Sequence, residues 1–243
     1  VVSHGTSISL SCEGVVKIWY TNRVLYGLCR YNMLMNKKLV ILDFDGTLAD
    51  TMPFMLSIMD QLADRFKVRR FNPDELSSLR KLPAPTIMKM HKIPMWKLPL
   101  MARESQRLLN QNIESVKLFP GMDQVVRELA DKGIQIALVT SNTLDNVLKV
   151  LGEEIAQLIS VFECQVGLFG KSSKLSKVIR KAGVRLEEVV SIGDEIRDIE
   201  AAQHLGIPCA AVTWGYADVE ALRRYNPDYL VSDVKDLLSV IFK

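Results

Sequence analysis

Two aspartates, Asp43 and Asp45, stand where the aliphatic run at residues 39–42 ends and a Gly-Thr turn begins. Such a run is typical of a strand buried on both faces of a parallel sheet, and these sheets bind ligands at the carboxyl ends of their strands. Residues i and i+2 of an extended segment point to the same side, so the two carboxylates can converge. They repel each other unless a cation or a shared proton lies between them. The segment therefore indicates a metal or acid–base site, although Asp-Gly-Thr is also an ordinary turn.

Polar side chains also stand at the boundaries of a second strand and a helix. The apolar run at residues 134–139 is followed by Ser141 and Asn142, which brings a small hydroxyl to the end of the strand. Lys171 follows a glycine at the start of an amphipathic segment that extends to residue 182. A lysine is poorly placed there for helix stability, but a helix start also favours a bound anion that the lysine can meet.

A third predicted strand, at residues 189–192, leads into two more carboxylates. Asp194 stands at the end of this strand, and Asp198 follows four residues later. That spacing is one helical turn, so both side chains can face the same cavity. Structural alternatives remain, because Asp198 could be an exposed helix charge and Ser141 could simply cap the helix that follows it.

Taken in chain order, the four segments resemble the four motifs of the haloacid dehalogenase superfamily, and particularly its phosphatases with a helical C1 cap, such as the phosphoglycolate phosphatase group. The resemblance covers the chain from about residue 37 to its end. The matching residues are Asp43-Phe44-Asp45-Gly46-Thr47, Ser141, Lys171, and Gly193-Asp194 with Asp198. Many relatives carry a proline after the lysine of the third motif, whereas Ser172 stands here. Lys174 is therefore an alternative to Lys171, which we prefer because it directly follows the glycine.

The resemblance implies a Mg²⁺-dependent phosphatase that acts on a small phosphorylated metabolite. Asp43 would be the nucleophile that forms an aspartyl-phosphate, and Asp45 would protonate the leaving oxygen and then deprotonate the attacking water. Mg²⁺ would be held by a carboxylate oxygen of Asp43, the backbone carbonyl of Asp45 and a carboxylate oxygen of Asp194. Asp198 would lie behind these ligands and orient Lys171 or a metal-bound water.

The resemblance also implies a binding site for the phosphoryl group. Lys171 and Ser141 would hold its oxygens as charge spreads over them, and Thr47 and Asn142 are expected to contribute to phosphate binding. Asp45 separates the chain from the dehalogenase branch, whose pattern lacks a carboxylate two positions after the first aspartate. Phosphoryl transfer is therefore favoured over dehalogenation.

Two rival functions remain open. One is a phosphomutase of the β-phosphoglucomutase type, which would return the phosphoryl group to a sugar and would require a bisphosphate activator. The other is a binding or regulatory module that keeps the pocket without turnover. A binding pocket has no need for a nucleophile and an acid–base partner, so such a module is disfavoured by the intact set of Asp43, Asp45, Ser141, Lys171 and Asp194.

The elements that must position these residues alternate between strand and helix. Further strands are expected at residues 209–213 and around residues 229–231. Four amphipathic stretches end in a glycine, which is typical of helix C-termini; these glycines are Gly133, Gly152, Gly183 and Gly206. We therefore predict an α/β fold with a Rossmann-like parallel sheet core, formed by residues 35–50 and 119–243, and with helices on both faces.

An insertion at residues 51–118 separates the first two motifs and shows no buried-strand pattern. Apolar residues recur at helical spacing over residues 53–66 and 98–116, and the segment from Asn72 to Glu75 is a good helix start. An insertion at this point resembles the helical cap that closes over the active site in this superfamily. We therefore expect an inserted all-helical cap domain.

The predicted cap is basic, with twelve Lys and Arg against six Asp and Glu. A basic lid suits an anionic substrate, but solvated helix faces explain most of these charges equally well. The residues that we would test for specificity are Arg80, Lys89, His91, Trp96 and Lys97. For His91 and Trp96, a packing role is an equal alternative.

Composition agrees with a globular enzyme. A chain of 243 residues with 48% hydrophobic content can bury a sizeable core. The net charge of +3 and the absence of a basic run argue against a nucleic-acid partner, and no membrane partner is expected. The four cysteines show neither metal-type spacing nor a paired framework, so a reduced, cytoplasmic location is expected. The sequence does not indicate an oligomeric state.

The first 34 residues fit poorly with the rest of the chain. Met35 leads straight into the first predicted strand and resembles a natural start, with Met33 as an alternative. Charged residues interrupt the apolar part of the preceding stretch, so it is neither a convincing membrane span nor a signal peptide. We expect residues 1–34 to be an N-terminal extension of upstream or expression-derived sequence. The alternative is an accessory segment that docks through its aromatic residues.

Overall fold

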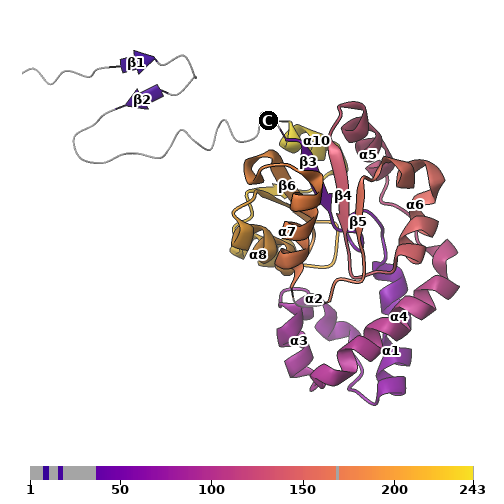
Figure 1. Cartoon of the computed structure of the whole chain (residues 1–243). Helices are drawn as coiled ribbons and strands as arrows, with labels where there is room; N and C mark the ends of the chain where they lie inside the picture. Colours follow the sequence, from indigo (N-terminus) through magenta and orange to yellow (C-terminus); the bar gives the residue numbers. More distant parts are fainter. Residues whose placement is uncertain (1–7, 11–15, 19–36, 168–169, 243) are drawn as a thin grey trace, which may run out of the picture.

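A six-stranded parallel sheet forms the centre of the computed structural model, which describes residues 8–10, 16–18, 37–167 and 170–242 (Figure 1). Its strands follow the order β5-β4-β3-β6-β7-β8. They are β3 (Leu39–Leu42), β4 (Gln135–Val139), β5 (Val161–Glu163), β6 (Val189–Gly193), β7 (Cys209–Val212) and β8 (Tyr229–Val231). The predicted α/β, Rossmann-like class is confirmed.

Helices cover both faces of the sheet because the central strands are apolar on both sides. In β3, Val40 and Leu42 pack into one hydrophobic cluster, whereas Leu39 and Ile41 pack into the other. The first cluster includes residues of α5 (Met122–Asp131), α6 (Leu144–Leu158) and α10 (Val234–Ile241). The second includes residues of α7 (Lys171–Ala182), α8 (Ile196–Leu205) and α9 (Val219–Arg224). These two clusters fix β3 in the middle of the protein.

The predicted strands at 39–42, 134–139, 189–192, 209–213 and 229–231 all form, within one residue at their ends, whereas β5 was not predicted. Each of the four predicted C-terminal glycines has a positive φ. Gly152 differs from the others because the chain returns to helix after it, so that α6 contains a kink at this glycine.

Helices also account for the predicted cap, residues 51–118. They are α1 (Met52–Phe66), η1 (Pro73–Glu75), α2 (Leu76–Leu79), α3 (Ala84–Met90), η2 (Met95–Lys97), α4 (Leu98–Gln111) and η3 (Ile113–Ser115). In Figure 1, α1 to α4 lie together below the sheet. Asn72 begins η1 as expected, because its side chain accepts a hydrogen bond from Asp74 N.

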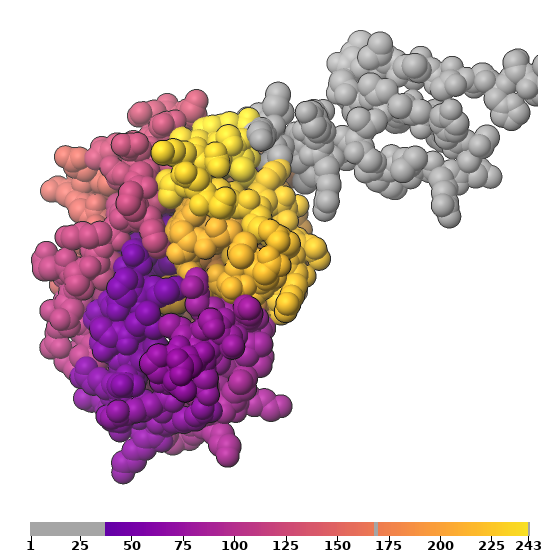
Figure 2. Space-filling view, turned by 180° about the vertical axis from the view of Figure 1, so that it is seen from behind, coloured from indigo at the N-terminus to yellow at the C-terminus, as the bar shows by residue number. Residues whose placement is uncertain are grey.

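The two segments that join the cap to the core are bonded to each other. Asp50 N donates to Lys117 O at 2.9 Å, and Phe119 N donates to Leu48 O at 2.9 Å. An isolated antiparallel bridge joins Ala49 to Leu118 between these bonds. Seen from behind, the indigo-to-purple surface of the cap adjoins the yellow surface of the C-terminal part of the core (Figure 2). The chain therefore enters and leaves the cap at one place.

The predicted N-terminal extension, residues 1–34, lies mostly outside the described residues. Within it, β1 (Ile8–Leu10) pairs antiparallel with β2 (Val16–Ile18). Cys12 and Cys29 fall outside the described ranges, whereas Cys164 and Cys209 are free thiols. Among the described helices, none combines the length and the apolar character that crossing a bilayer requires.

Edge strand β5 is tied to α7 by charged groups. Glu163, at the end of β5, is buried and accepts hydrogen bonds from Lys174 at 2.7 Å and Lys177 at 3.0 Å. These bonds lower the pKa of Glu163 from 4.5 to about 2. Because the folded-state pKa is depressed, the resulting stability is present above the unfolded pKa and is lost as the pH falls towards the folded value.

We expect Glu163→Gln to lower the free energy of unfolding at pH 7 by about 1 kcal/mol. The difference from wild type should shrink as the pH falls below about 4.5, because the wild-type carboxylate then loses its contribution. Urea denaturation at a series of pH values measures both effects. The exposed Glu153→Gln serves as the control and should leave stability unchanged. A difference that stays constant on acidification would contradict this account.

Candidate active site

Three buried aspartates converge at the carboxyl ends of β3 and β6. Asp43 follows β3, Asp194 follows β6, and Asp198 lies in the first turn of α8. One carboxylate oxygen from each lies within 4.8 Å of the others. Parallel strands with adjacent carboxyl ends bring these side chains together, as the sequence predicted.

Lys171 supplies positive charge to this cluster from the start of α7. Its ammonium Nζ lies 2.6 Å from Asp43 Oδ2 and also forms an ion pair with Asp198. Burial alone would lower the pKa of Lys171, but the charges of Asp198 and Asp43 raise it above its usual value. The side chain is therefore a buried cation. Lys174, the alternative, points to Glu163 instead.

Asp194 is held by donors on both carboxylate oxygens. The hydroxyl of Thr47 donates to Oδ1 at 2.7 Å, and Tyr216 N donates to Oδ2 at 2.7 Å. Gly46 and Gly215 lie so close to this carboxylate that a Cβ at either position would collide with it. Gly46 also has a φ of +77°, a conformation that side chains disfavour. The backbone at Gly46 and Gly215 therefore packs directly against the carboxylate of Asp194.

Asp45, two residues after Asp43, is hydrogen-bonded to neutral side chains. Asn142 Nδ2 donates to its Oδ1 at 3.1 Å, and Thr140 Oγ1 donates to its Oδ2 at 3.3 Å. Burial and the charge of Asp43 raise the pKa of Asp45 to about 6. A carboxyl group with such a pKa can both give and take a proton near neutral pH.

The start of α8 adds a second cation, Arg197, to the cluster. Arg197 Nη2 lies 2.8 Å from Glu195 Oε1 and 3.9 Å from Asp43 Oδ2. Glu195 N donates to Asp198 Oδ2 at 2.9 Å, which fixes the carboxylate that pairs with the lysine. Burial, followed by the charges of Glu195, Asp198 and Asp43, raises the pKa of Asp194 well above its usual value. The carboxylates outnumber the cations here.

The arrangement fits a divalent cation. Hard carboxylate oxygens are the ligands that Mg²⁺ prefers, and the excess negative charge around Asp194 favours a cation at that point. Asp43 and Asp194, two of the ligands proposed from the sequence, belong to this carboxylate cluster. The carboxylate cluster adds Asp198, whereas the sequence assigned the third ligand to the backbone carbonyl of Asp45.

Of the two hydroxyl residues that follow β4, Thr140 is the one whose side chain contacts Asp45. The buried Thr140 side chain reaches Asp45, whereas Ser141 contributes its backbone carbonyl to Gln106 Nε2 at 2.6 Å. The resemblance assigns the hydroxyl of the second motif to Ser141, which is adjacent to Thr140. The contact between Thr140 and Asp45 depends on the exact residue at which the strand ends.

Sequence reasoning also missed three residues around the cluster, namely Glu195, Arg197 and Tyr216. Glu195 and Arg197 lie between Asp194 and Asp198 in the sequence, and their charges are a signal that could have identified them. Tyr216 had no such signal, because its backbone N reaches Asp194 from a loop after β7 and its hydroxyl lies 2.8 Å from Thr51 Oγ1.

The cap residues that were proposed for specificity make varied contacts. The guanidinium of Arg80 donates to the carbonyls of Tyr216 at 2.8 Å and Gly215 at 2.9 Å, so it docks the cap on the core. His91 is buried and stacks on Phe71, which agrees with the packing alternative for this residue.

The remaining three candidates are Lys89, Trp96 and Lys97. Lys89 and Trp96 are exposed. Lys97 donates to Phe66 O at 2.6 Å and so holds the end of α1.

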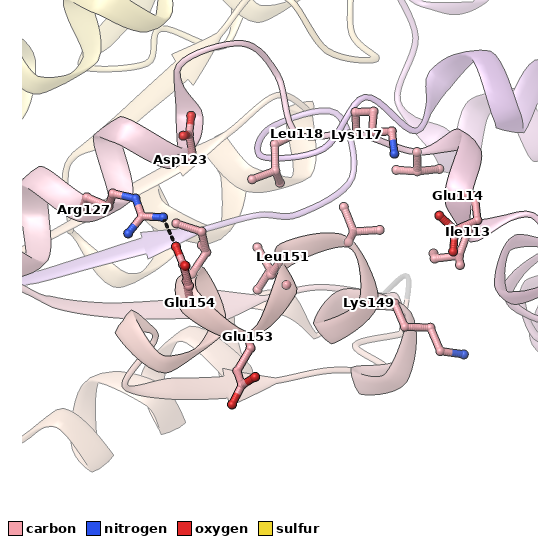
Figure 3. A pocket seen from close by; sticks show the side chains of 14 residues that line it. Ile113, Glu114, Lys117, Leu118, Asp123, Arg127, Lys149, Leu151, Glu153 and Glu154 are labelled. Carbon is pink, nitrogen blue, oxygen red and sulfur yellow. Dashed lines mark hydrogen bonds and ion pairs between the residues drawn. The ribbon is translucent and has the colours of Figure 1, made fainter.

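A pocket of about 480 Å³ lies away from these residues, between η3, α5 and α6 (Figure 3). Arg127 and Glu154 point toward each other there and form an ion pair at 2.7 Å. None of the carboxylates of the cluster lines this pocket. The pocket lies at the kink of α6 and is therefore separate from the carboxylate cluster.

The family profile described as "Haloacid dehalogenase-like hydrolase" matches residues 40–212. A phosphoglycolate phosphatase of Synechococcus elongatus is 29% identical over 203 residues, which cover 83% of this chain and 96% of the relative. The pyrophosphatase PpaX of Oceanobacillus iheyensis is 22% identical, over 85% of this chain and 98% of the relative. The solved structure of a haloacid dehalogenase-like hydrolase from Streptococcus pneumoniae superposes with a TM-score of 0.69 at 17% identity, over 84% of this chain and 97% of that one.

If the carboxylate cluster binds Mg²⁺, the cation should stabilise the folded protein. At a concentration roughly 100-fold above Kd, we expect the melting temperature to rise by about 5 °C over a NaCl control of equal ionic strength. Asp194→Asn should lose most of this rise, because it removes a charged oxygen ligand. Asp123→Asn, on α5 outside the cluster, is the matched control and should keep it. An undiminished rise in Asp194→Asn would exclude Asp194 as a ligand.

Proposed function

The chain belongs to the haloacid dehalogenase-like hydrolase family, and from this we propose that it is a phosphatase that hydrolyses small phosphorylated metabolites through an aspartyl-phosphate on Asp43. One observation carries the proposal. The buried carboxylate of Asp43 lies beside the Lys171 ammonium, and Asp45 follows two residues later with a pKa near neutrality. A nucleophile, a cation and an acid–base group are thus combined at the mouth of one sheet.

In the first step, an oxygen of Asp43 attacks the phosphorus and the bond from phosphorus to the leaving oxygen breaks. The protonated form of Asp45 gives its proton to that oxygen, which departs as an alcohol. The phosphoryl group is then bound to Asp43 as an acyl phosphate, and Asp45 is left as a carboxylate.

In the second step, water attacks the phosphorus of the acyl phosphate. The Asp45 carboxylate takes a proton from this water as the new oxygen–phosphorus bond forms. The bond from phosphorus to the Asp43 oxygen breaks, which releases inorganic phosphate and restores the nucleophile. Asp45 is protonated again, so the cycle closes with no net proton change on the protein.

Positive charge and hydrogen-bond donors must stabilise the phosphoryl oxygens during both steps. Lys171 is the buried ammonium closest to the nucleophile and is assigned this role. The hydroxyl after β4 is assigned a supporting role, and the contact with Asp45 favours Thr140 over Ser141. Thr47 and Asn142, proposed from the sequence as phosphate ligands, instead donate to Asp194 and Asp45 in this structure. Their proposed contribution is therefore to hold these carboxylates.

Mg²⁺ would be held by Asp43 and Asp194, with the backbone carbonyl of Asp45 as the third proposed protein ligand. Bound there, it would supply the positive charge that offsets the repulsion between the phosphate and the carboxylates. Asp198 pairs with Lys171, which supports its assignment as the residue that orients the lysine.

The substrate class follows from the relatives and from the cap. Phosphoglycolate phosphatase and PpaX are by name enzymes for small phosphate esters or anhydrides, and the chain covers nearly their whole length. The cap of helices α1 to α4 is assigned the role of excluding water and selecting the substrate. Free thiols at Cys164 and Cys209 support a reducing compartment such as the cytoplasm.

We expect Asp43→Asn to lower kcat by at least about 10³-fold, because an amide cannot act as the nucleophile. Phosphate release is measured on 2-phosphoglycolate, pyrophosphate, glycerol 3-phosphate, sugar phosphates and p-nitrophenyl phosphate, with Mg²⁺ or with chelator. Asp123→Asn is the matched control and should keep its activity. Melting curves verify that both variants fold.

Retention of substantial activity by a folded Asp43→Asn would exclude Asp43 as the nucleophile. Strict dependence on a sugar bisphosphate, with transfer to a sugar and not to water, would favour the phosphomutase. Silence of the wild type across the panel with Mg²⁺ present would favour the binding module.

A further inference from the structure

A chain of side-chain amides runs from the cap to Asp45. Its central member is Asn146 in the first turn of α6, which is fully buried. Asn146 touches two cap residues on α4, Gln106 and Asn110, and one core residue, Asn142. Asn142 in turn touches Asp45.

The directions of these hydrogen bonds are fixed by the backbone. The main-chain carbonyl of Gln106 can only accept, so Asn146 must direct its Nδ2 towards it, at 3.1 Å. The second hydrogen on this Nδ2 is donated to Asn142 Oδ1 at 3.0 Å. Asn146 Oδ1 accepts from Asn110 Nδ2 at 2.8 Å, so the buried amide is fully bonded.

The orientation of Asn142 follows from that of Asn146. Asn142 Oδ1 accepts from Thr143 N at 2.9 Å as well as from Asn146. Its Nδ2 must therefore point the other way, where it donates to Asp45 Oδ1 at 3.1 Å. A carboxylate whose oxygens are held by donors keeps one orientation, which a proton transfer to the leaving oxygen requires.

We propose that Asn146 is a positioning residue that, through Asn142, holds Asp45 in the orientation needed to protonate the leaving group, with helix α4 of the cap as the anchor. The inference rests on the proposed function, because it assigns the acid–base role to Asp45. Gln106 adds a second contact at the same place, since its side chain donates to Ser141 O at 2.6 Å. The orientation of the proton donor therefore depends on the hydrogen bonds between α4 and the core.

Substrates with different leaving groups separate this role from a purely structural one. An alkyl phosphate expels a strongly basic oxygen that needs a proton, whereas p-nitrophenolate departs without one. The value of kcat/KM reports the steps up to the loss of the leaving group. The ratio of kcat/KM for the alkyl phosphate to that for p-nitrophenyl phosphate is also independent of the fraction of folded enzyme.

The experiment measures this ratio for Asn146→Ala and for Asn146→Asp, which keeps the shape of the side chain but loses its donors. The alkyl phosphate is the one that wild type hydrolyses best in the panel above. We expect kcat/KM for the alkyl phosphate to fall by about 10- to 100-fold, and that for p-nitrophenyl phosphate by less than about threefold. Asn112→Ala, a cap residue that bonds to Leu108 O, is the matched control and should keep the wild-type ratio.

A double-mutant cycle tests the route through Asn142. If Asn146 acts through Asn142, then Asn142→Ala with Asn146→Ala should show the same ratio as Asn142→Ala alone. Equal losses on both substrates, an unchanged ratio, or independent effects in the double variant would each overturn the proposal. A wild type that hydrolyses neither substrate would overturn the proposed function, and this inference with it.

Discussion

Repulsion between buried carboxylates is the constraint on which this site depends. Asp43, Asp194 and Asp198 lie within a few ångströms of one another at the ends of two neighbouring strands, and Asp45 and Glu195 flank them. Burial and the charges of neighbouring carboxylates raise the pKa values of Asp45, Asp194 and Glu195, which favours their protonated forms. Asp43, the proposed nucleophile, must nevertheless keep its charge. The structure resolves this conflict at Asp43 by placing the Lys171 ammonium in contact with it and Arg197 nearby.

The other two carboxylates discussed here, Asp194 and Asp45, differ in the groups that surround them. Asp194 accepts two hydrogen bonds, and the backbone packs closely against its carboxylate. This fixed position suits a ligand of a cation. Among the described residues, the hydrogen-bond donors to Asp45 are neutral, and its pKa is raised to about 6. Carboxylates that are close in sequence and space thus acquire different properties from their partners alone. The cap contacts the surroundings of both carboxylates. Arg80 bonds to the loop that lies beside Asp194, and α4 bonds to the loop that lies beside Asp45.

The sequence predicts the parts of the fold that depend on continuous apolar runs. Strands β3, β4 and β6 are buried on both faces and carry such runs, so their ends, and with them Asp43 and Asp194, could be located. Strand β5 could not, because its three residues show no periodicity and it is held by pairing with β4 and by the contacts of Glu163 with two lysines of α7. The choice between Thr140 and Ser141 depends on the residue at which β4 ends. Contacts such as that of Arg80 with Tyr216 join segments that are 136 residues apart and leave no local pattern.

The paired linkers have a consequence for how such a protein can diversify. The chain leaves the core at Ala49 and returns at Leu118, and these two residues face each other across a single bridge. The cap is thus an insertion whose two ends lie side by side. Its length and composition can change without shifting the register of β3 against its neighbours. Sequence changes can therefore accumulate in the cap while the carboxylate cluster of the core keeps its geometry, within the limits set by cap side chains that bond to the core, such as Arg80 and Gln106.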